Sequence, residues 1–146
     1  FTLPILIAAK TYFLTATAAA RHMVQKRSGV ILTLSSSSSG LSGRDRRYHL
    51  TGGFSTACAT IEALSRSLAG ELGPFGIRVV CLRPDAIPET WPTDHVESRT
   101  YMENGTVLGR LPTLEEVANA AVLVASDRAS AMTGAIVNLS CGSIMD

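Results

Sequence analysis

Apolar residues recur at three- and four-residue spacing over residues 5–26 and again over residues 54–72, the spacing of one face of an α-helix. The repeating positions of the first segment are Ala9, Tyr12, Phe13, Ala16, Ala20 and Met23. Those of the second are Phe54, Ala57, Cys58, Ile61, Leu64, Ser65, Leu68 and Leu72. Gly29 and Gly73-Pro74 follow the two segments and supply stop signals. The pattern predicts two long amphipathic helices.

Three short apolar runs, at residues 30–34, 77–82 and 135–139, are typical of strands buried on both faces. A capping box, Thr113 to Glu116, predicts the start of a third helix. We expect its buried stripe to comprise Leu114, Val117, Ala118, Ala121, Val122 and Ala125. The alternation of helix and strand predicts an α/β fold with right-handed crossovers and a parallel sheet.

Two polar segments interrupt these elements. A serine run, Ser35 to Ser39, continues into a Gly- and Arg-rich loop that ends at Gly53. Residues 83–110 are long, polar and proline-containing, which favours a mobile flap or lid over packed structure.

Composition narrows the class of protein. The 146 residues fit one domain, residues 1–146, and a formal net charge of +1 gives no strong field toward nucleic acid. Lys10 and Arg21 interrupt the first apolar stretch, so we expect no membrane span. Three cysteines without CxxC spacing favour a reducing compartment, and hence a cytoplasmic protein.

The sequence lacks the patterns that are typical of two common kinds of site, a metal site and a serine hydrolase site. The three histidines, His22, His49 and His95, are far apart and lack metal-ligand spacing, so no metal site is expected. The chain has no GxSxG elbow, which disfavours a Ser-His-Asp hydrolase.

Three blocks, residues 28–36, 54–82 and 108–142, resemble the second half of short-chain dehydrogenases/reductases. The resemblance covers nearly the whole chain and implies a Rossmann-like three-layer parallel sheet. The family's glycine-rich GxxxGxG turn has no counterpart, so the N-terminal nucleotide-binding half is expected to be absent from this chain. Because that turn holds the pyrophosphate, we expect the chain alone to bind a dinucleotide weakly.

The resemblance also implies a reaction, hydride transfer between NAD or NADP and a small carbonyl or alcohol compound. The family's catalytic serine falls on Ser36, whose hydroxyl can hold the substrate oxygen. The catalytic tyrosine position falls on Phe54, the lysine position on Cys58 and the asparagine position on Ala8. None of these three carries the expected chemistry.

Other residues offer alternatives for the missing proton relay. Tyr48 lies twelve residues after Ser36, and His49 or Arg46 and Arg47 beside it can supply a positive charge. Tyr48 as an exposed loop residue, and Ser36 as one member of a flexible serine run, are the structural alternatives. Cys58 is a further candidate acid, with an ordinary pKa of ~8.5.

The segment from Pro84 to Thr90 resembles the family's loop against the nicotinamide. By resemblance, Pro84, Ala86, Ile87 and Thr90 bind cofactor, whereas Asp85 stands where glycine is usual. The alternative is that this segment is only a rigid connection from the strand to the following loop.

Three hypotheses about function stay open. The first is an NAD(P)-dependent oxidoreductase that is incomplete or catalytically atypical. The second is a pseudoenzyme of the same fold that serves assembly, as a homo-oligomer through helices 5–26 and 54–72. The third is a gene fragment without a function of its own.

Overall fold

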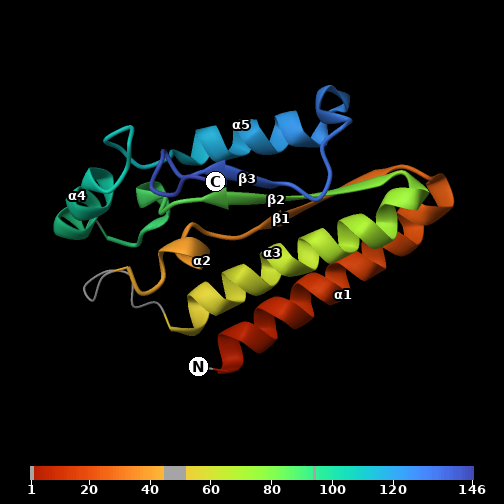
Figure 1. The fold of residues 1–146 in the computed structure, drawn as a ribbon, viewed down its shortest axis with the longest axis horizontal. Helices are drawn as coiled ribbons and strands as arrows, with labels where there is room; N and C mark the ends of the chain where they lie inside the picture. The colour runs from red at the N-terminus through yellow and green to blue at the C-terminus, as the bar shows by residue number, and fades with distance from the viewer. Residues whose placement is uncertain (1, 45–51, 94) are drawn as a thin grey trace.

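The computed structural model describes residues 2–44, 52–93 and 95–146, which form three layers (Figure 1). Helices α1 (Thr2–Lys26) and α3 (Gly53–Leu72) cover one face of a sheet, and α5 (Leu114–Ala125) covers the other. The sheet consists of β1 (Gly29–Leu34), β2 (Ile77–Pro84) and β3 (Ile136–Leu139), in that order. This arrangement confirms the predicted α/β, Rossmann-like fold.

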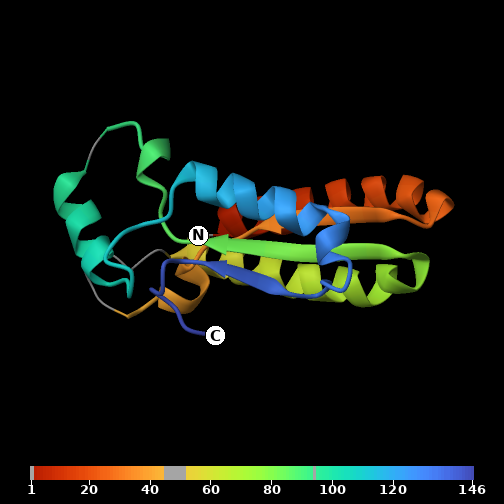
Figure 2. The ribbon, with the colours of Figure 1, turned by 90° about the horizontal axis from the view of Figure 1, so that it is seen from above.

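Among the described residues both strand pairs are parallel, so their carboxyl ends meet at one end of the molecule. The register runs from Gly29 opposite Ile77 to Leu34 opposite Leu82, and Cys81 lies opposite Ile136. Two further helices, α2 (Ser38–Leu41) and α4 (Val96–Asn104), lie beyond these carboxyl ends (Figures 1 and 2). In parallel α/β sheets this end is where ligands bind.

Alternate residues of β2 fill two apolar layers. Val79 faces α1 and α3, whereas Val80 and Leu82 face α5. The first layer consists of Ala16, Ile31, Leu68, Ala69, Ile77 and Val79. Burial of β2 on both faces explains why its sequence is a continuous apolar run without alternation.

The buried stripe expected on α5 is largely wrong. The buried side chains are Val117 and Val124, whereas Leu114 and Val122 are 53% and 72% exposed. Ala121 and Val124 pack in the layer with Val80 and Leu82, whereas much of the remaining apolar surface of the helix is exposed. Its start is as predicted: Thr113 Oγ1 accepts from the Glu116 N–H at 3.1 Å, and Glu116 Oε2 accepts from the Thr113 N–H at 2.9 Å.

The segment over residues 83–110, expected as a mobile flap, contains regular elements that the sequence pattern did not predict. The segment contains the short 3₁₀ turn η2 (Pro88–Thr90) and helix α4. Glu89 ties it to the next helix, because its Oε2 accepts from the Leu114 N–H at 2.6 Å. The helical pattern escaped prediction because α4 buries none of its side chains and therefore lacks an apolar stripe.

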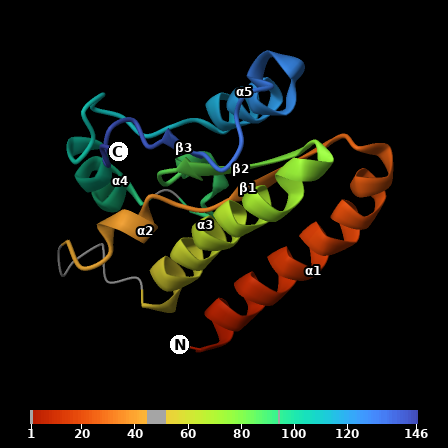
Figure 3. The ribbon, with the colours of Figure 1, turned by 45° about the vertical axis from the view of Figure 1, so that its right-hand side comes forward.

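Helix α1 packs beside α3 along its length (Figure 3) but keeps much of its apolar surface exposed. The large exposed apolar side chains of α1 are Leu3, Leu6, Ile7, Phe13 and Leu14. Phe13 was expected inside and is 51% exposed. Residues 3–26 are long and apolar enough to cross a membrane, a criterion that core helices of globular proteins also meet. Tyr12 joins α1 to the sheet, because its hydroxyl donates to the Leu34 carbonyl at 3.0 Å.

Candidate active site

The serine run extends the pairing of β1 with β2 beyond the end of β1. The Ser35 N–H donates to the Leu82 carbonyl and the Ser37 N–H to the Pro84 carbonyl, both at 2.9 Å. The intervening Ser36 is therefore held at the carboxyl end of the sheet, beside the point where β2 passes into its loop. Helix α2 begins two residues later.

A cavity of about 330 Å³ opens at this point. Its walls are Ser35, Ser36, Ser38, Leu41, Phe54, Pro84, Asp85, Ala86, Ile87, Thr90, Trp91 and Met102. The structure thus brings together Ser36, the tyrosine position at Phe54 and all four residues of the expected cofactor loop. Tyr48, the other catalytic candidate, lies outside the described residues.

Ser36 is half-buried, and its hydroxyl is held by its own turn. Its Oγ accepts from the Ser38 N–H at 3.2 Å, and its O–H donates to the Ser38 Oγ at 3.3 Å. An oxygen that accepts from a backbone N–H becomes a better donor of its own proton. To donate to a ligand oxygen in the cavity, the hydroxyl has to rotate away from the Ser38 Oγ.

The tyrosine and lysine positions carry neither an acid nor a cation. Phe54 presents a ring that is 52% exposed, which was expected on the buried face of α3. Cys58 lies one helical turn further, is 3% exposed, and does not contribute to the cavity wall. Burial raises the pKa of the Cys58 thiol to about 11, and a backbone hydrogen bond from Ser36 only partly offsets this. The thiol is protonated at neutral pH, so it supplies no charge that would lower the pKa of a neighbouring acid.

Tyr12, which the sequence pattern indicated only as a core position of the first helix, lies near the site. It lies one helical turn after Ala8, the asparagine position, and its hydroxyl reaches the end of β1 at Leu34. Burial raises the pKa of the Tyr12 phenol. The periodicity of α1 indicated a core position for Tyr12, but a hydrogen bond to a residue twenty-two positions away has no signal in the sequence.

The loop after β2 is bonded within itself. The Thr90 hydroxyl donates to the Ile87 carbonyl at 2.8 Å, and the Ala86 N–H donates to Asp85 Oδ1 at 2.7 Å. Asp85 Oδ2 accepts from the Ser143 hydroxyl, which belongs to the segment after β3. The Asp85 side chain therefore reaches toward residues 140–146.

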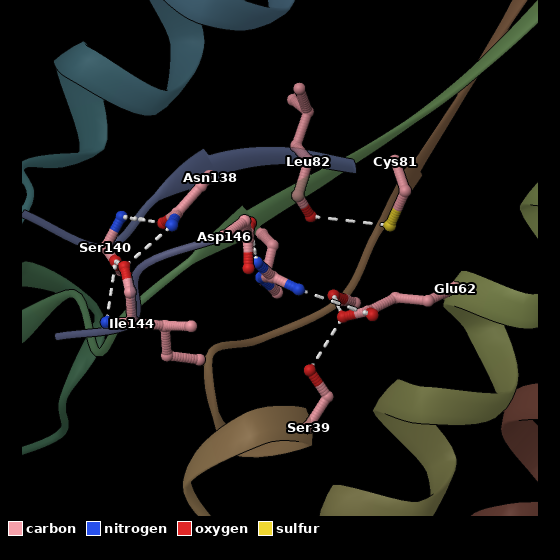
Figure 4. Close-up of polar contacts among 10 residues, drawn as sticks. Ser39, Glu62, Cys81, Leu82, Asn138, Ser140, Ile144 and Asp146 are labelled. Atoms are coloured by element: carbon pink, nitrogen blue, oxygen red, sulfur yellow. Dashed lines mark hydrogen bonds and ion pairs between the residues drawn. The ribbon is translucent and has the colours of Figure 1, made fainter. Parts of the chain in front are cut away.

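A buried polar network lies beneath the serine turn. Glu62 Oε1 accepts from the Ser35 and Ser39 hydroxyls, each at 2.7 Å, as Figure 4 shows for Ser39. Glu62 Oε2 lies 3.5 Å from Arg83 Nη1, and Arg83 Nη2 also pairs with Asp146. The two serines bonded to Glu62 lie on either side of Ser36. The carboxylate thus fixes the backbone that carries the candidate catalytic serine.

The residues that would hold a nicotinamide are present in part. Ala86, Ile87 and Thr90 line the cavity, but the Ala86 N–H is already paired with Asp85 and the Thr90 hydroxyl with the Ile87 carbonyl. Within the described parts of the chain, no group of three or more His, Cys, Asp or Glu side chains could hold a metal ion.

Comparison with known proteins establishes the family. The family model described as enoyl-(acyl carrier protein) reductase matches residues 1–143. The chain is 32% identical to sorbitol-6-phosphate 2-dehydrogenase of Klebsiella pneumoniae, a match that covers 91% of this chain and 54% of that protein. The chain therefore belongs to the short-chain dehydrogenase/reductase family.

Two solved structures show the same fold. The sorbitol-6-phosphate 2-dehydrogenase of Erwinia amylovora superposes with a TM-score of 0.86 at 24% identity, over 100% of this chain and 60% of that one. An NAD+-bound short-chain dehydrogenase of Leptospira borgpetersenii also gives 0.86, at 22% identity, over 97% and 55%. The chain spans about half the length of the relatives it matches.

Proposed function

We propose that this chain provides the substrate-facing half of an NAD(P)-dependent oxidoreductase that interconverts a carbonyl and an alcohol. The observation that carries the proposal is the single cavity that joins Ser36, Phe54 and the loop from Pro84 to Thr90. The family membership supports the same class of reaction.

In the proposed reaction an alcohol and NAD(P)+ give a carbonyl, NAD(P)H and a proton, or the reverse. The cofactor supplies the hydride acceptor or donor. Ser36 donates a hydrogen bond to the substrate oxygen and stabilises negative charge that develops there. Ala86, Ile87 and Thr90, which line the cavity, would hold the nicotinamide end of the cofactor.

The route of the proton distinguishes this chain from the family pattern. Phe54 has no exchangeable proton, and the Cys58 thiol holds its proton at neutral pH because its pKa is about 11. We therefore assign proton transfer to Tyr48 or to water that enters the cavity. Either route lacks the lysine that usually lowers the tyrosine pKa, so we expect turnover to be slow.

A second candidate function is assembly without catalysis. Five large apolar side chains of α1 are at least half exposed, and Phe54, at the start of α3, is 52% exposed. Several large apolar side chains exposed on one helix favour burial of that surface against a second copy of the chain. We propose a homo-oligomer that forms through α1 and α3. We also propose a cytoplasmic location, which the three free thiols favour.

Titration of the purified chain with NADH, followed by fluorescence, tests cofactor binding. Saturation at millimolar concentration or below supports the first proposal, and no signal over that range rules out cofactor binding by this chain alone. NADPH in a parallel titration decides between the two cofactors. Light scattering in the same buffer tests assembly, because a monomer contradicts the second proposal.

Restoration of the family's relay gives a sharper test of the reaction. In the double variant Phe54→Tyr, Cys58→Lys, we expect carbonyl reduction on the order of 10²-fold faster than in the unaltered chain. The single variant Phe54→Tyr is the matched control, because it adds the proton donor without the cation. A double variant that binds cofactor, folds and shows no gain contradicts the assignment of the cavity as the reaction site.

A further inference from the structure

Residues 140–146, which follow β3, form a strap between β3 and the elements around the serine turn. Asn138, on β3, fixes the course of the strap. Its side chain donates to the Ile144 carbonyl at 2.8 Å and accepts from the Ser140 N–H at 3.1 Å (Figure 4). Ile144 lies against α2, because a Cβ added at Gly40 would come within 2.9 Å of its Cδ1. The strap therefore has a defined path and is not a loose segment.

Two residues of the strap are bonded to opposite walls of the candidate active-site cavity, and neither of them lines that cavity. Ser143 is the first anchor, because its hydroxyl donates to Asp85 Oδ2 in the loop after β2. Asp146 is the second anchor, because its carboxylate pairs with Arg83 near the end of β2. Asp85 itself lines the cavity, whereas Arg83 is connected to it through Glu62 and the serine turn.

Arg83 is shared between two carboxylates. Its Nη1 lies 3.5 Å from Glu62 Oε2, longer than the ~2.8 Å of a charge-assisted hydrogen bond, whereas its Nη2 contacts Asp146 Oδ2 directly. Within the described parts of the chain, its buried Nε has no hydrogen-bond partner. Because the Arg83 side chain is only 9% exposed, water has little access to replace a carboxylate that is lost.

The position of Glu62 therefore depends on Asp146. Without Asp146 the buried guanidinium moves onto Glu62, because a buried charge is stable only when it is paired. Glu62 Oε1 accepts from the Ser35 and Ser39 hydroxyls, each at 2.7 Å, on either side of Ser36. A carboxylate that is drawn toward the guanidinium holds these hydroxyls less well, and the serine turn loosens.

We propose that Asp146 and Ser143 are positioning residues, through which the strap sets the two walls of the candidate active site separately. Asp146 acts on the serine turn through Arg83 and Glu62, by its charge. Ser143 acts on the loop after β2 through Asp85, by one hydrogen bond. That these walls serve a reaction rests on the proposed function, whereas the positioning itself does not.

Amide hydrogen exchange of the isotopically labelled chain, followed by NMR without cofactor or substrate, tests the proposal. The Ser35 and Ser37 amides report on the serine turn, because both are bonded to carbonyls of β2. The Cys81 amide, which is bonded to the carbonyl of the residue before β3, is the reference. In Asp146→Asn we expect the two serine amides to exchange about tenfold faster relative to Cys81. The Asp146 side chain is 46% exposed, so we expect its variants to fold.

Two further variants separate charge from shape and one anchor from the other. Asp146→Glu keeps the charge, so exchange in the serine turn should stay within about threefold of the unaltered chain. Ser143→Ala removes only the other anchor. We expect it to speed exchange of the Ala86 amide, which donates to Asp85 Oδ1, by about threefold or more and to leave the serine turn within about threefold.

Each contrary result overturns the inference. Unchanged exchange in Asp146→Asn shows that the strap does not hold the turn, and an equal rise at Cys81 shows a general loss of stability instead of local positioning. Equal acceleration in Asp146→Glu excludes an effect of charge. Acceleration of the serine turn by Ser143→Ala excludes separate anchors. Because no turnover is measured, a chain that shows the expected exchange but never reacts contradicts only the proposed function.

Discussion

Glu62 and Arg83 form an ion pair in which Oε2 and Nη1 are 3.5 Å apart and each side chain is only 9% exposed. The pair joins the middle of α3 to the carboxyl end of β2. Because Glu62 also accepts from Ser35 and Ser39, the same carboxylate holds the turn that carries Ser36. Charge buried in this way is stabilising only while both partners remain.

Replacement of Glu62 by glutamine is expected to destabilise the fold. The change removes the charge beside Arg83 and leaves the guanidinium with Asp146 as its remaining ion-pair partner. We expect the free energy of unfolding, measured in urea, to fall by about 2–4 kcal/mol. Glu103→Gln, in the exposed pair with Arg99, is the matched control and should change it by less than about 0.5 kcal/mol. Similar small effects from both variants would contradict a structural role for the buried pair.

The capping box predicts a dependence of stability on acid pH. Hydrogen bonds from Arg110 and from the Thr113 backbone lower the pKa of Glu116 to about 2. Its unfolded value is ~4.3, so the folded state binds this proton less readily. The contribution is therefore fully present above the unfolded pKa and is lost as pH falls through about 2.

Thermal unfolding from pH 7 to pH 2 checks this dependence. We expect Glu116→Gln to unfold at a lower temperature than the unaltered chain at pH 7, and the difference to disappear toward pH 2. Glu115→Gln is the neighbouring control, since the described residues place no ion pair there. If the difference in unfolding temperature between the two proteins stays constant with pH, the variant's loss of stability comes from packing and not from ionisation of Glu116.

Cysteine reactivity reports the environment of the lysine position. At pH 8 we expect an aromatic disulfide reagent to modify the partly exposed Cys141 first, and Cys58 and Cys81 only after unfolding. Mass spectrometry of the labelled peptides gives the order. Rapid labelling of Cys58 in the folded chain would contradict both its burial and its raised pKa.

The same thiol predicts a loss of stability at alkaline pH. The folded pKa of Cys58, about 11, lies above its unfolded value of ~8.5. The unfolded state loses the proton first, so this stabilisation is present below the unfolded value and is lost as pH rises through the folded one. Cys58→Ala should flatten the alkaline decline in unfolding temperature, whereas an unchanged decline would assign it to other groups.

Gly76 and Gly70 are expected to respond to alanine in opposite directions. Gly76 has a positive φ of 75°, and a Cβ there would lie 2.5 Å from the Arg27 carbonyl oxygen. We expect Gly76→Ala to cost at least about 1–3 kcal/mol of unfolding free energy. Gly70 lies in α3 with open space around it, so Gly70→Ala should stabilise by about 0.5–1 kcal/mol. Urea unfolding of both variants measures the contrast, and equal effects would contradict the backbone assignment.

The elements with strong local patterns were predictable, and those without were not. Helices α1 and α3, the three strands and the Thr113 cap follow from apolar spacing, β-branched runs and stop signals within a few neighbouring residues. Helix α4 carries no apolar stripe and was missed. In α5 Val117 was predicted to be buried and Val124 was missed, because the sheet beneath selects the buried side and apolar residues lie on more than one side of this helix.

The sequence by itself determined the order of helices and strands, the family, and the loss of tyrosine and lysine at Phe54 and Cys58. These properties depend on residue type and spacing alone. Only the tertiary structure decided that Ser36 and the loop from Pro84 to Thr90 share one cavity. It also decided that Glu62 forms an ion pair with Arg83, and that Asp85 accepts a hydrogen bond from Ser143. Contacts between residues far apart in the chain depend on how helices and strands pack, which no local pattern encodes.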